Sequence, residues 1–196
     1  MKTDSLEYKE HLENKYLPGR STYLKHFFYP KIFKTFHNQG KIYDLGCGMG
    51  EFLSFCKSKN REAIGIDSNV HLVDICKNKG LNAVVDNVIS PASINEQIQN
   101  VLIDNVLEHL DNDALNIFFE NSTKYIQKGG FLIVIIPDKK GFKKDPTHIT
   151  FVNYNILKEK CDMFNLKIKS QFSHPFNVKS VGNFLYLNMQ VFVIQY

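Results

Sequence analysis

A glycine-rich turn follows directly on a short apolar run near the end of the first quarter of the chain. The apolar run covers residues 42–45, and the glycines stand as G-x-G-x-G at Gly46, Gly48 and Gly50. A nicotinamide-binding turn has the spacing G-x-G-x-x-G, so the third glycine comes one residue early. Because glycine adopts positive φ angles and lets a backbone approach a ligand, the turn predicts a ligand-binding loop between a strand and a helix. A tight connection without a ligand leaves three closely spaced glycines unexplained.

Length and composition predict one compact domain over residues 1–196. Hydrophobic residues make up 43% of the chain and charged residues 22%, an ordinary globular balance. The net charge of +4 permits an anionic substrate but does not demand nucleic acid. The four cysteines form no C-x-x-C pair, which predicts reduced thiols in a cytoplasmic protein. The polar start does not resemble a signal peptide, and no apolar run is long enough to cross a bilayer.

Strand and helix patterns alternate along most of the chain. Helices are predicted over residues 5–38 with a break at 17–19, and over 51–59, 70–78, a segment after Asp111, and 155–163. Strands are predicted over 42–45, 62–66, 83–85, 101–104, 131–136, 166–172 and 190–194.

Helix boundaries are predicted from capping residues. Ser68 is the predicted N-cap of the helix over 70–78, and Gly80 its C-cap. Asp111 is expected to begin a helix whose apolar spacing reaches Ile126 and which Gly129-Gly130 ends. Alternating strands and helices imply a parallel sheet covered on both faces, with ligands bound outside the carboxyl ends of the strands.

Polar residues stand at these strand ends. Asp67 ends the second strand about twenty residues beyond the glycine turn, where an acidic residue meets ribose hydroxyls in Rossmann-type folds. Asp86 ends the third strand, and residues 105–110 follow the fourth as Asn-Val-Leu-Glu-His-Leu. The structural alternatives are a helix cap for Asp67, a turn for Asp86 and a core histidine for His109.

Four segments in this order resemble the motifs of the class I S-adenosylmethionine-dependent methyltransferases. They are residues 42–52, 65–68, 84–87 and 101–110, and the resemblance runs from about residue 40 to 160. It implies S-adenosyl-L-methionine as cofactor. It also implies an α/β fold: a Rossmann-like, doubly wound, mostly parallel seven-stranded sheet with an antiparallel C-terminal strand. Residues 1–38 are then a helical lid and residues 39–196 the core.

The resemblance assigns cofactor contacts residue by residue. Asp44 orders the glycine loop, Asp67 meets the ribose, and Asp86 receives the adenine amino group. The whole set is Asp44, Gly46, Cys47, Gly48, Gly50, Asp67, Ser68, Asp86, Asn87, Asn105 and Val106. Arg20 is a further candidate, because a guanidinium can pair with the cofactor carboxylate, although a surface salt bridge is the plainer interpretation.

The candidate catalytic residues are His148 and Asp145, in Asp-Pro-Thr-His after the fifth strand. The family often carries a D-x-x-H-x-x-F pattern there. Methyl transfer to an alcohol needs a base, and histidine has a suitable pKa that Asp145 can support by orienting the ring. The alternative is structural: Asp145 begins a turn, and His148 holds the loop by a backbone hydrogen bond.

Glu108, His109 and His148 raise the hypothesis of a divalent metal site. The small-RNA 3′-terminal methyltransferases have a similar Glu-x-x-Glu-His motif and a later histidine. Asn105 stands where their first glutamate would be. Because this replacement removes a charged ligand, the sequence predicts no metal.

The predicted function is methylation of an oxygen atom of a small molecule, a phosphorylated sugar or a glycan. A cluster of lysines after the fifth strand makes an anionic acceptor attractive: Lys139, Lys140, Lys143 and Lys144. The runner-up is an RNA or nucleotide methyltransferase, which predicts a broad basic face. A non-catalytic module that binds S-adenosylmethionine is a third hypothesis, and the glycine spacing disfavours a nicotinamide oxidoreductase.

Overall fold

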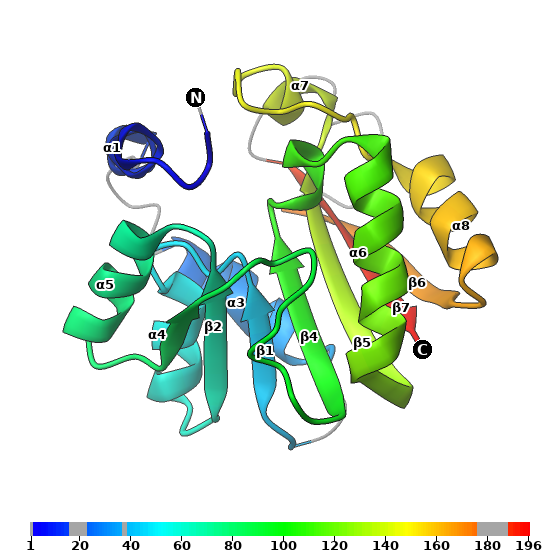
Figure 1. Cartoon of the computed structure of the whole chain (residues 1–196), viewed down its shortest axis with the longest axis horizontal. Coiled ribbons are helices and arrows are strands. Elements are labelled where there is room, and N and C mark those ends of the chain that lie inside the picture. The colour runs from blue at the N-terminus through cyan, green and yellow to red at the C-terminus, as the bar shows by residue number, and fades with distance from the viewer. Residues whose placement is uncertain (1, 16–22, 37–38, 176–187) are drawn as a thin grey trace.

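The computed structural model describes residues 2–15, 23–36, 39–175 and 188–196, and its centre is a seven-stranded sheet (Figure 1). The strands are β1 (Ile42–Leu45), β2 (Ala63–Asp67), β3 (Ala83–Val85), β4 (Ile98–Asp104), β5 (Ile126–Pro137), β6 (Lys167–His174) and β7 (Met189–Gln195). Their order is β3-β2-β1-β4-β5-β7-β6. The first five pair in parallel, and β7 is antiparallel to both β5 and β6. The predicted Rossmann-like fold with an antiparallel C-terminal strand is confirmed.

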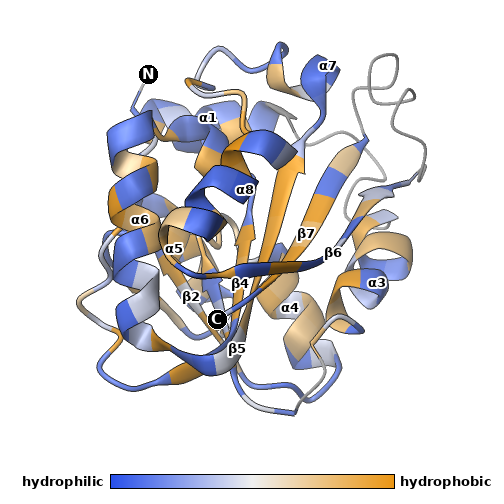
Figure 2. Ribbon diagram, turned by 90° about the vertical axis from the view of Figure 1, so that its right-hand side faces the viewer, coloured by the Kyte–Doolittle hydropathy of each residue, from blue (hydrophilic) through white to orange (hydrophobic). Residues whose placement is uncertain are grey.

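Helices cover both faces of this sheet. They are α1 (Leu6–Lys15), the π-helix η1 (Leu24–Phe28), α3 (Tyr29–Phe33), α4 (Glu51–Ser58), α5 (Val70–Asn78), the 3-10 turn η2 (Leu107–His109), α6 (Asn112–Tyr125), α7 (Lys139–Phe142) and α8 (Tyr154–Met163). In Figure 1, α6 and α8 lie in front of the sheet, and α3 lies behind it. Figure 2 shows the apolar strands enclosed between helices whose outer faces are polar.

The strands divide their side chains between two cores. Along β5, Leu132, Val134 and Ile136 pack with α6 and α8, whereas Ile133 and Ile135 pack with η1, α3 and α4. All five side chains are fully buried. Burial on both faces is the reason that this strand reads as a continuous apolar run rather than an alternating one.

The end of α6 was predicted wrongly. The helix ends at Tyr125, and Ile126 already belongs to β5, so Gly129 and Gly130 lie within the strand instead of ending the helix. The last residue of the chain pairs here: the Gly129 N–H donates to the Tyr196 carbonyl, and the Tyr196 N–H donates to Gly130. Pairing with a distant segment therefore overrides the local glycine signal.

Other boundaries were closer. Asp111 caps α6 as predicted, with its carboxylate accepting from the Ala114 N–H, and Gly80 follows α5 with a φ of +65°. The N-cap of α5 is Asn69 rather than Ser68, because the Asn69 side chain accepts from the N–H groups of His71 and Leu72.

Two further segments differ in extent. Strand β4 begins three residues before the predicted start. The described part of the predicted helix over 23–36 is the π-helix η1 followed by α3.

The strand order places the site. It changes direction between β1 and β4, which is where ligands bind in open α/β sheets. Figure 2 shows α1 and α7 beyond the carboxyl ends of the parallel strands. The described helices include none long and apolar enough to cross a membrane.

Candidate functional site

The loop after β1 is shaped by its glycines. Gly46, Gly48 and Gly50 all have positive φ, at 78°, 52° and 77°. A Cβ on Gly46 would stand 2.2 Å from Val106 Cγ2, so no side chain fits there. A Cβ on Gly48 would meet nothing within 4 Å, which leaves the backbone open to a ligand. Because the Cys47 side chain is buried, a ligand at this part of the loop would meet the backbone and not a side chain.

The Asp67 carboxylate ties the loop to the start of α5. One oxygen accepts from the Gly48 N–H and the other from the Asn69 N–H, each at 2.9 Å. Burial raises the pKa of Asp67, against the lowering effect of these two donors. The Asp86 N–H donates to the Asp67 carbonyl at 3.0 Å. Gly48, Asp67 and Asp86 therefore form one connected edge.

The Asp86 carboxylate is already engaged within its own loop. It accepts from the Asn87 N–H at 2.7 Å and from the Ser93 N–H at 2.6 Å. Burial acts to raise the pKa of Asp86, but these bonds hold it below the ordinary value. The Asn87 N–H, which the resemblance directs to an adenine ring, is thus turned to Asp86 in this structure.

A cleft of about 630 Å³ opens beside these strand ends. Its lining joins the ends of β2 and β3 to η2, the loop after α7 and the N-terminal segment. The lining residues are Lys2, Thr3, Asp4, Ser68, Val85, Asp86, Asn87, His109, Thr147 and Ile149. The structure therefore brings Ser68, Asp86 and Asn87 of the predicted set onto one cavity wall with His109.

Asp44 and Asn105 lie at the ends of β1 and β4, where the strand order changes direction. Asp44 is buried, and burial, followed by the charges of Asp104, Cys76 and Asp67, raises its pKa well above the ordinary value. Asn105 has a φ of +54°, and its amide donates to the Asp104 carboxylate at 2.6 Å.

The His148 side chain is almost fully enclosed and packs against His109, which lines the cleft. Its Nδ1 lies 2.8 Å from the Phe142 carbonyl oxygen, and its Nε2 lies 3.7 Å from Glu108 Oε1 and 3.9 Å from Asp145 Oδ2. The His109 ring packs edge-on at 4.9 Å between centroids. The ring is therefore oriented by a backbone carbonyl, as the structural alternative expected, while its second nitrogen faces two carboxylates.

Asp145 connects this loop to the N-terminal helix. Its Oδ1 accepts from the N–H and the hydroxyl of Thr147, and its Oδ2 lies 3.3 Å from His11 Nε2. The sequence did not identify His11, which is 134 residues away along the chain. Its only signal was the i, i+3 spacing from Tyr8, which places both side chains on one face of α1.

Tyr8 stands among the carboxylates of the site. Burial, and then the charges of Asp145, Asp67 and Glu108, raise the pKa of the Tyr8 phenol. Its ring meets the His109 ring edge-on at 6.0 Å between centroids. Helix α1 therefore packs against the Asp145 loop through His11 and against His109 through Tyr8.

Asn69 holds the segment before α1 in place. Its amide donates to the carbonyl oxygens of Thr3 and Ser5, at 3.0 and 2.8 Å. Sequence analysis missed this role, although asparagine is as good an N-cap as the neighbouring Ser68.

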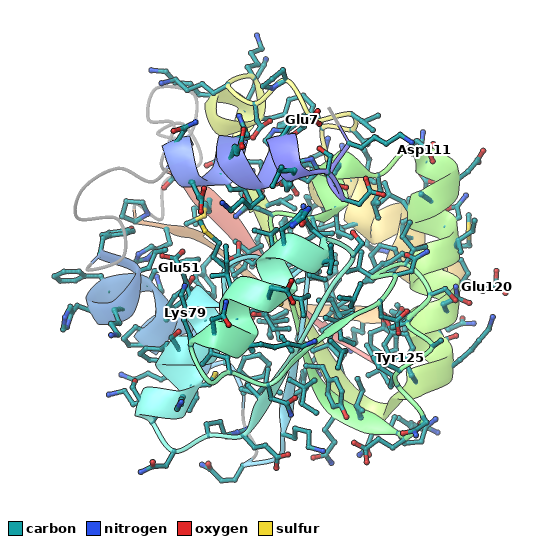
Figure 3. All side chains as sticks on the ribbon, turned by 60° about the vertical axis from the view of Figure 1, so that its left-hand side comes forward. Glu7, Glu51, Lys79, Asp111, Glu120 and Tyr125 are labelled. Atoms are coloured by element: carbon teal, nitrogen blue, oxygen red, sulfur yellow. The ribbon has the colours of Figure 1, made fainter. Side chains whose placement is uncertain are left out.

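A second hollow of about 450 Å³ lies on the other side of the glycine loop. Glu51 and Lys79 are on its wall and are labelled in Figure 3, below α1. Its other lining residues are Glu13, Lys25, Tyr29, Met49 and Ser54. Arg20, the predicted partner of a cofactor carboxylate, lies outside the described residues.

The strand order, the glycine loop and the carboxylates at successive strand ends define an α/β protein that binds a nucleoside-containing ligand. A methyltransferase domain family model matches residues 8–171, which is more than half of the chain. The chain therefore belongs to this family, the class I S-adenosylmethionine-dependent methyltransferases, and its cofactor is S-adenosyl-L-methionine. Among curated proteins, no sequence matches the chain significantly.

Solved structures share the fold at low sequence identity. An S-adenosylmethionine-dependent methyltransferase from Archaeoglobus fulgidus is 19% identical with a TM-score of 0.72, over 96% of this chain and 100% of that one. One from Clostridium acetobutylicum is 14% identical with a TM-score of 0.71, over 96% and 98%. The glycopeptide N-methyltransferase MtfA in complex with S-adenosylmethionine is 10% identical with a TM-score of 0.66, over 84% of each chain.

Proposed function

We propose that this enzyme methylates an oxygen atom of a small hydroxylated molecule, and that a phosphorylated sugar or glycan is its acceptor class. The observation that carries the proposal is the row of exposed lysines on and after α7, next to the loop that holds Asp145 and His148. These lysines are Lys139, Lys140, Lys143 and Lys144. A cluster of one charge sign raises the local concentration of an oppositely charged substrate.

The cleft supports the cofactor assignment. Its volume of about 630 Å³ falls within the usual range for small-molecule sites. The Asp67 and Asp86 carboxylates would receive the ribose hydroxyls and the adenine amino group, and the open backbone at Gly48 would face the methionine portion. When bound, the cofactor supplies a methyl group on a positively charged sulfur.

The protein then has to align the acceptor, exclude water and handle one proton. Alignment of the reacting atoms can supply much of the rate enhancement. Helix α1, with Tyr8 and His11 above the site, would exclude water. We propose that His148 and Asp145 act on the acceptor hydroxyl, because their nearly enclosed side chains contact His109 and Thr147, two residues that line the cleft. The four free cysteines support a reducing, cytoplasmic location.

The proposal is tested by measuring S-adenosylhomocysteine formation with matched pairs of acceptors. Each pair contains a hydroxylated sugar or nucleoside with and without a phosphate group. The phosphorylated member is expected to be the better substrate for the wild-type protein. Lys139→Gln combined with Lys140→Gln should raise KM for that member with little change in kcat, and Lys124→Gln on α6 is the control. Turnover limited to neutral amines would contradict the proposal.

Two alternatives have distinct outcomes in the same assay. An RNA methyltransferase would accept RNA oligonucleotides with a strongly salt-dependent affinity. A non-catalytic module would bind S-adenosylmethionine and form no S-adenosylhomocysteine with any acceptor pool.

A further inference from the structure

Glu108, His109 and His148 gather their ligand atoms in one small volume. One carboxylate oxygen and one ring nitrogen from each histidine all lie within 4.8 Å of one another. Glu108 is fully buried, and His148 Nε2 is 3.7 Å from its Oε1. A glutamate with two imidazoles is a common divalent-metal donor set in proteins.

Each histidine has its Nδ1 within hydrogen-bond distance of a backbone carbonyl oxygen. His109 Nδ1 lies 3.1 Å from the Thr147 carbonyl oxygen, and His148 Nδ1 lies 2.8 Å from the Phe142 carbonyl oxygen. A carbonyl only accepts, so each Nδ1 is the donor, and Nε2 is the nitrogen that a neutral ring would offer to a metal ion. Histidines that bind metals usually donate their other ring N–H to a carbonyl or carboxylate in this way.

The backbone fixes the two segments that carry these side chains. The Glu108 carbonyl accepts from the N–H groups of Ile149 and Thr150, at 2.8 and 3.1 Å. The turn η2 and the loop after α7 are thereby locked together. A site of this kind is pre-organised, so little conformational entropy is lost when an ion binds.

The surroundings carry the charge that a cation would offset. The Asp145 carboxylate adds an oxygen 3.9 Å from His148 Nε2. The Tyr8 ring of α1 meets the His109 ring edge-on from the same side as His11, which lies three residues further along the helix and contacts Asp145. The cleft reaches this cluster, because His109 and Thr147, whose carbonyl contacts the His109 ring, both line its wall.

We propose that Glu108, His109 and His148 bind one divalent transition-metal ion at the acceptor end of the cleft. Two imidazoles with one carboxylate suit zinc or cobalt better than magnesium or calcium, which prefer oxygen ligands alone. The proposal departs from the sequence-based expectation, which rested on Asn105. The structure assembles three ligand groups without that residue, whose amide is turned to Asp104.

This inference rests on the proposed methyl transfer to oxygen, and it gives His148 its role in that step. Glu108, His109 and His148 would hold the ion, which would lower the pKa of a bound acceptor hydroxyl and orient it. The hydroxyl proton would pass to the Asp145 carboxylate and then to water. The oxygen bonds to the methyl carbon as the carbon–sulfur bond breaks, and S-adenosylhomocysteine leaves with the electron pair.

The test is calorimetric titration of the chelator-treated full chain with zinc chloride, without substrate. Wild-type protein is expected to bind one ion. Glu108→Gln and His148→Gln should each weaken binding by more than about 100-fold, since losing even an outer partner of a metal ligand costs 10- to 100-fold. His71→Ala and Glu120→Gln, at exposed positions away from the cleft, are the matched controls and should bind like wild type.

Cobalt absorption provides a second measurement on the same variants. Cobalt-loaded wild-type protein should show ligand-field bands that both cluster variants lose. Absence of zinc binding by wild type, or undiminished binding by Glu108→Gln and His148→Gln, overturns the proposal. Titration with S-adenosylhomocysteine separates the two hypotheses: cofactor binding without metal binding rejects only the metal site, and loss of both in wild type rejects the proposed function.

Discussion

The two halves of the site are built by different means. On the proposed cofactor side, the shape comes from main-chain N–H groups and from glycines with positive φ. The hydrogen bonds join neighbouring strand ends, such as that from the Gly48 N–H to the Asp67 carboxylate. On the acceptor side, side chains from distant segments meet, such as His11 and Asp145, which are 134 residues apart. Unusual backbone geometry requires particular residue types, such as glycine, so it can be predicted from the sequence. A cluster of side chains cannot be predicted in this way, because it depends on how the loops pack.

This contrast predicts that some substitutions lower the turnover rate without changing the affinity for the cofactor, and that others do the reverse. His148→Ala should lower kcat by about 10²- to 10⁴-fold, because the proposed activation of the acceptor hydroxyl depends on this ring. The affinity for S-adenosylhomocysteine should stay within about twofold, because His148 lies outside the glycine loop. Steady-state kinetics and calorimetry check the two halves of this statement. Equal losses in both measurements would mean that the two regions are not independent.

Asp67→Ala should have the opposite profile. Removing a carboxylate that holds the loop, and that we propose binds the ribose, is expected to weaken S-adenosylhomocysteine binding by about 100-fold, since hydrogen bonds to charged groups contribute about 1.5–3 kcal/mol each. Asp74→Ala, an exposed change on α5, is the control. Unchanged calorimetric affinity in Asp67→Ala would remove this residue from the cofactor side.

The two glycines should differ in what they disturb. Gly46→Ala meets Val106 at 2.2 Å and has a positive φ, so it should lower the free energy of unfolding by about 3 kcal/mol. Gly48→Ala meets no neighbour and carries only the strain of its φ, about 1–2 kcal/mol. Its main effect should be weaker cofactor binding, because the methyl group fills the open space. Urea denaturation measures the free energy of unfolding of both variants, and calorimetry measures their affinity for the cofactor. The prediction is wrong if Gly48→Ala is less stable than Gly46→Ala.

The smallest expected effect concerns pH. The pKa of Asp86 is held below its ordinary value of 3.8 by bonds that include Ser93 and Asn87. An acid with a lowered pKa stabilises the fold above its ordinary pKa and loses this contribution as the pH falls through the lowered value. Asp86→Ala should therefore be less stable than wild type at pH 6, and the gap should narrow below about pH 4. Urea denaturation across this pH range measures the difference in free energy of unfolding between wild type and Asp86→Ala. A difference that grows as the pH falls would contradict the prediction.

Most of the fold could be predicted because its signals are local. The helix over residues 70–78, the strand over 83–85 and the Asp111 cap need only nearby residues, and each stands where expected. The start of β5 could not be predicted in this way. Its first residues pair with Ile98 and the C-terminal Tyr196, and no local pattern reports a partner at that distance.

The sequence by itself determined the α/β class, the glycine loop and the carboxylates at successive strand ends. The reason is that the alternation of strands with helices and the positive φ of glycine both depend on local residue types. Only the tertiary structure decided that Tyr8 contacts His109, that His11 contacts Asp145, and that Glu108, His109 and His148 converge. Such convergence depends on the Glu108 carbonyl binding the loop at Ile149 and on Asn69 holding the N-terminal segment. These are long-range bonds, and they form only when the whole chain is packed.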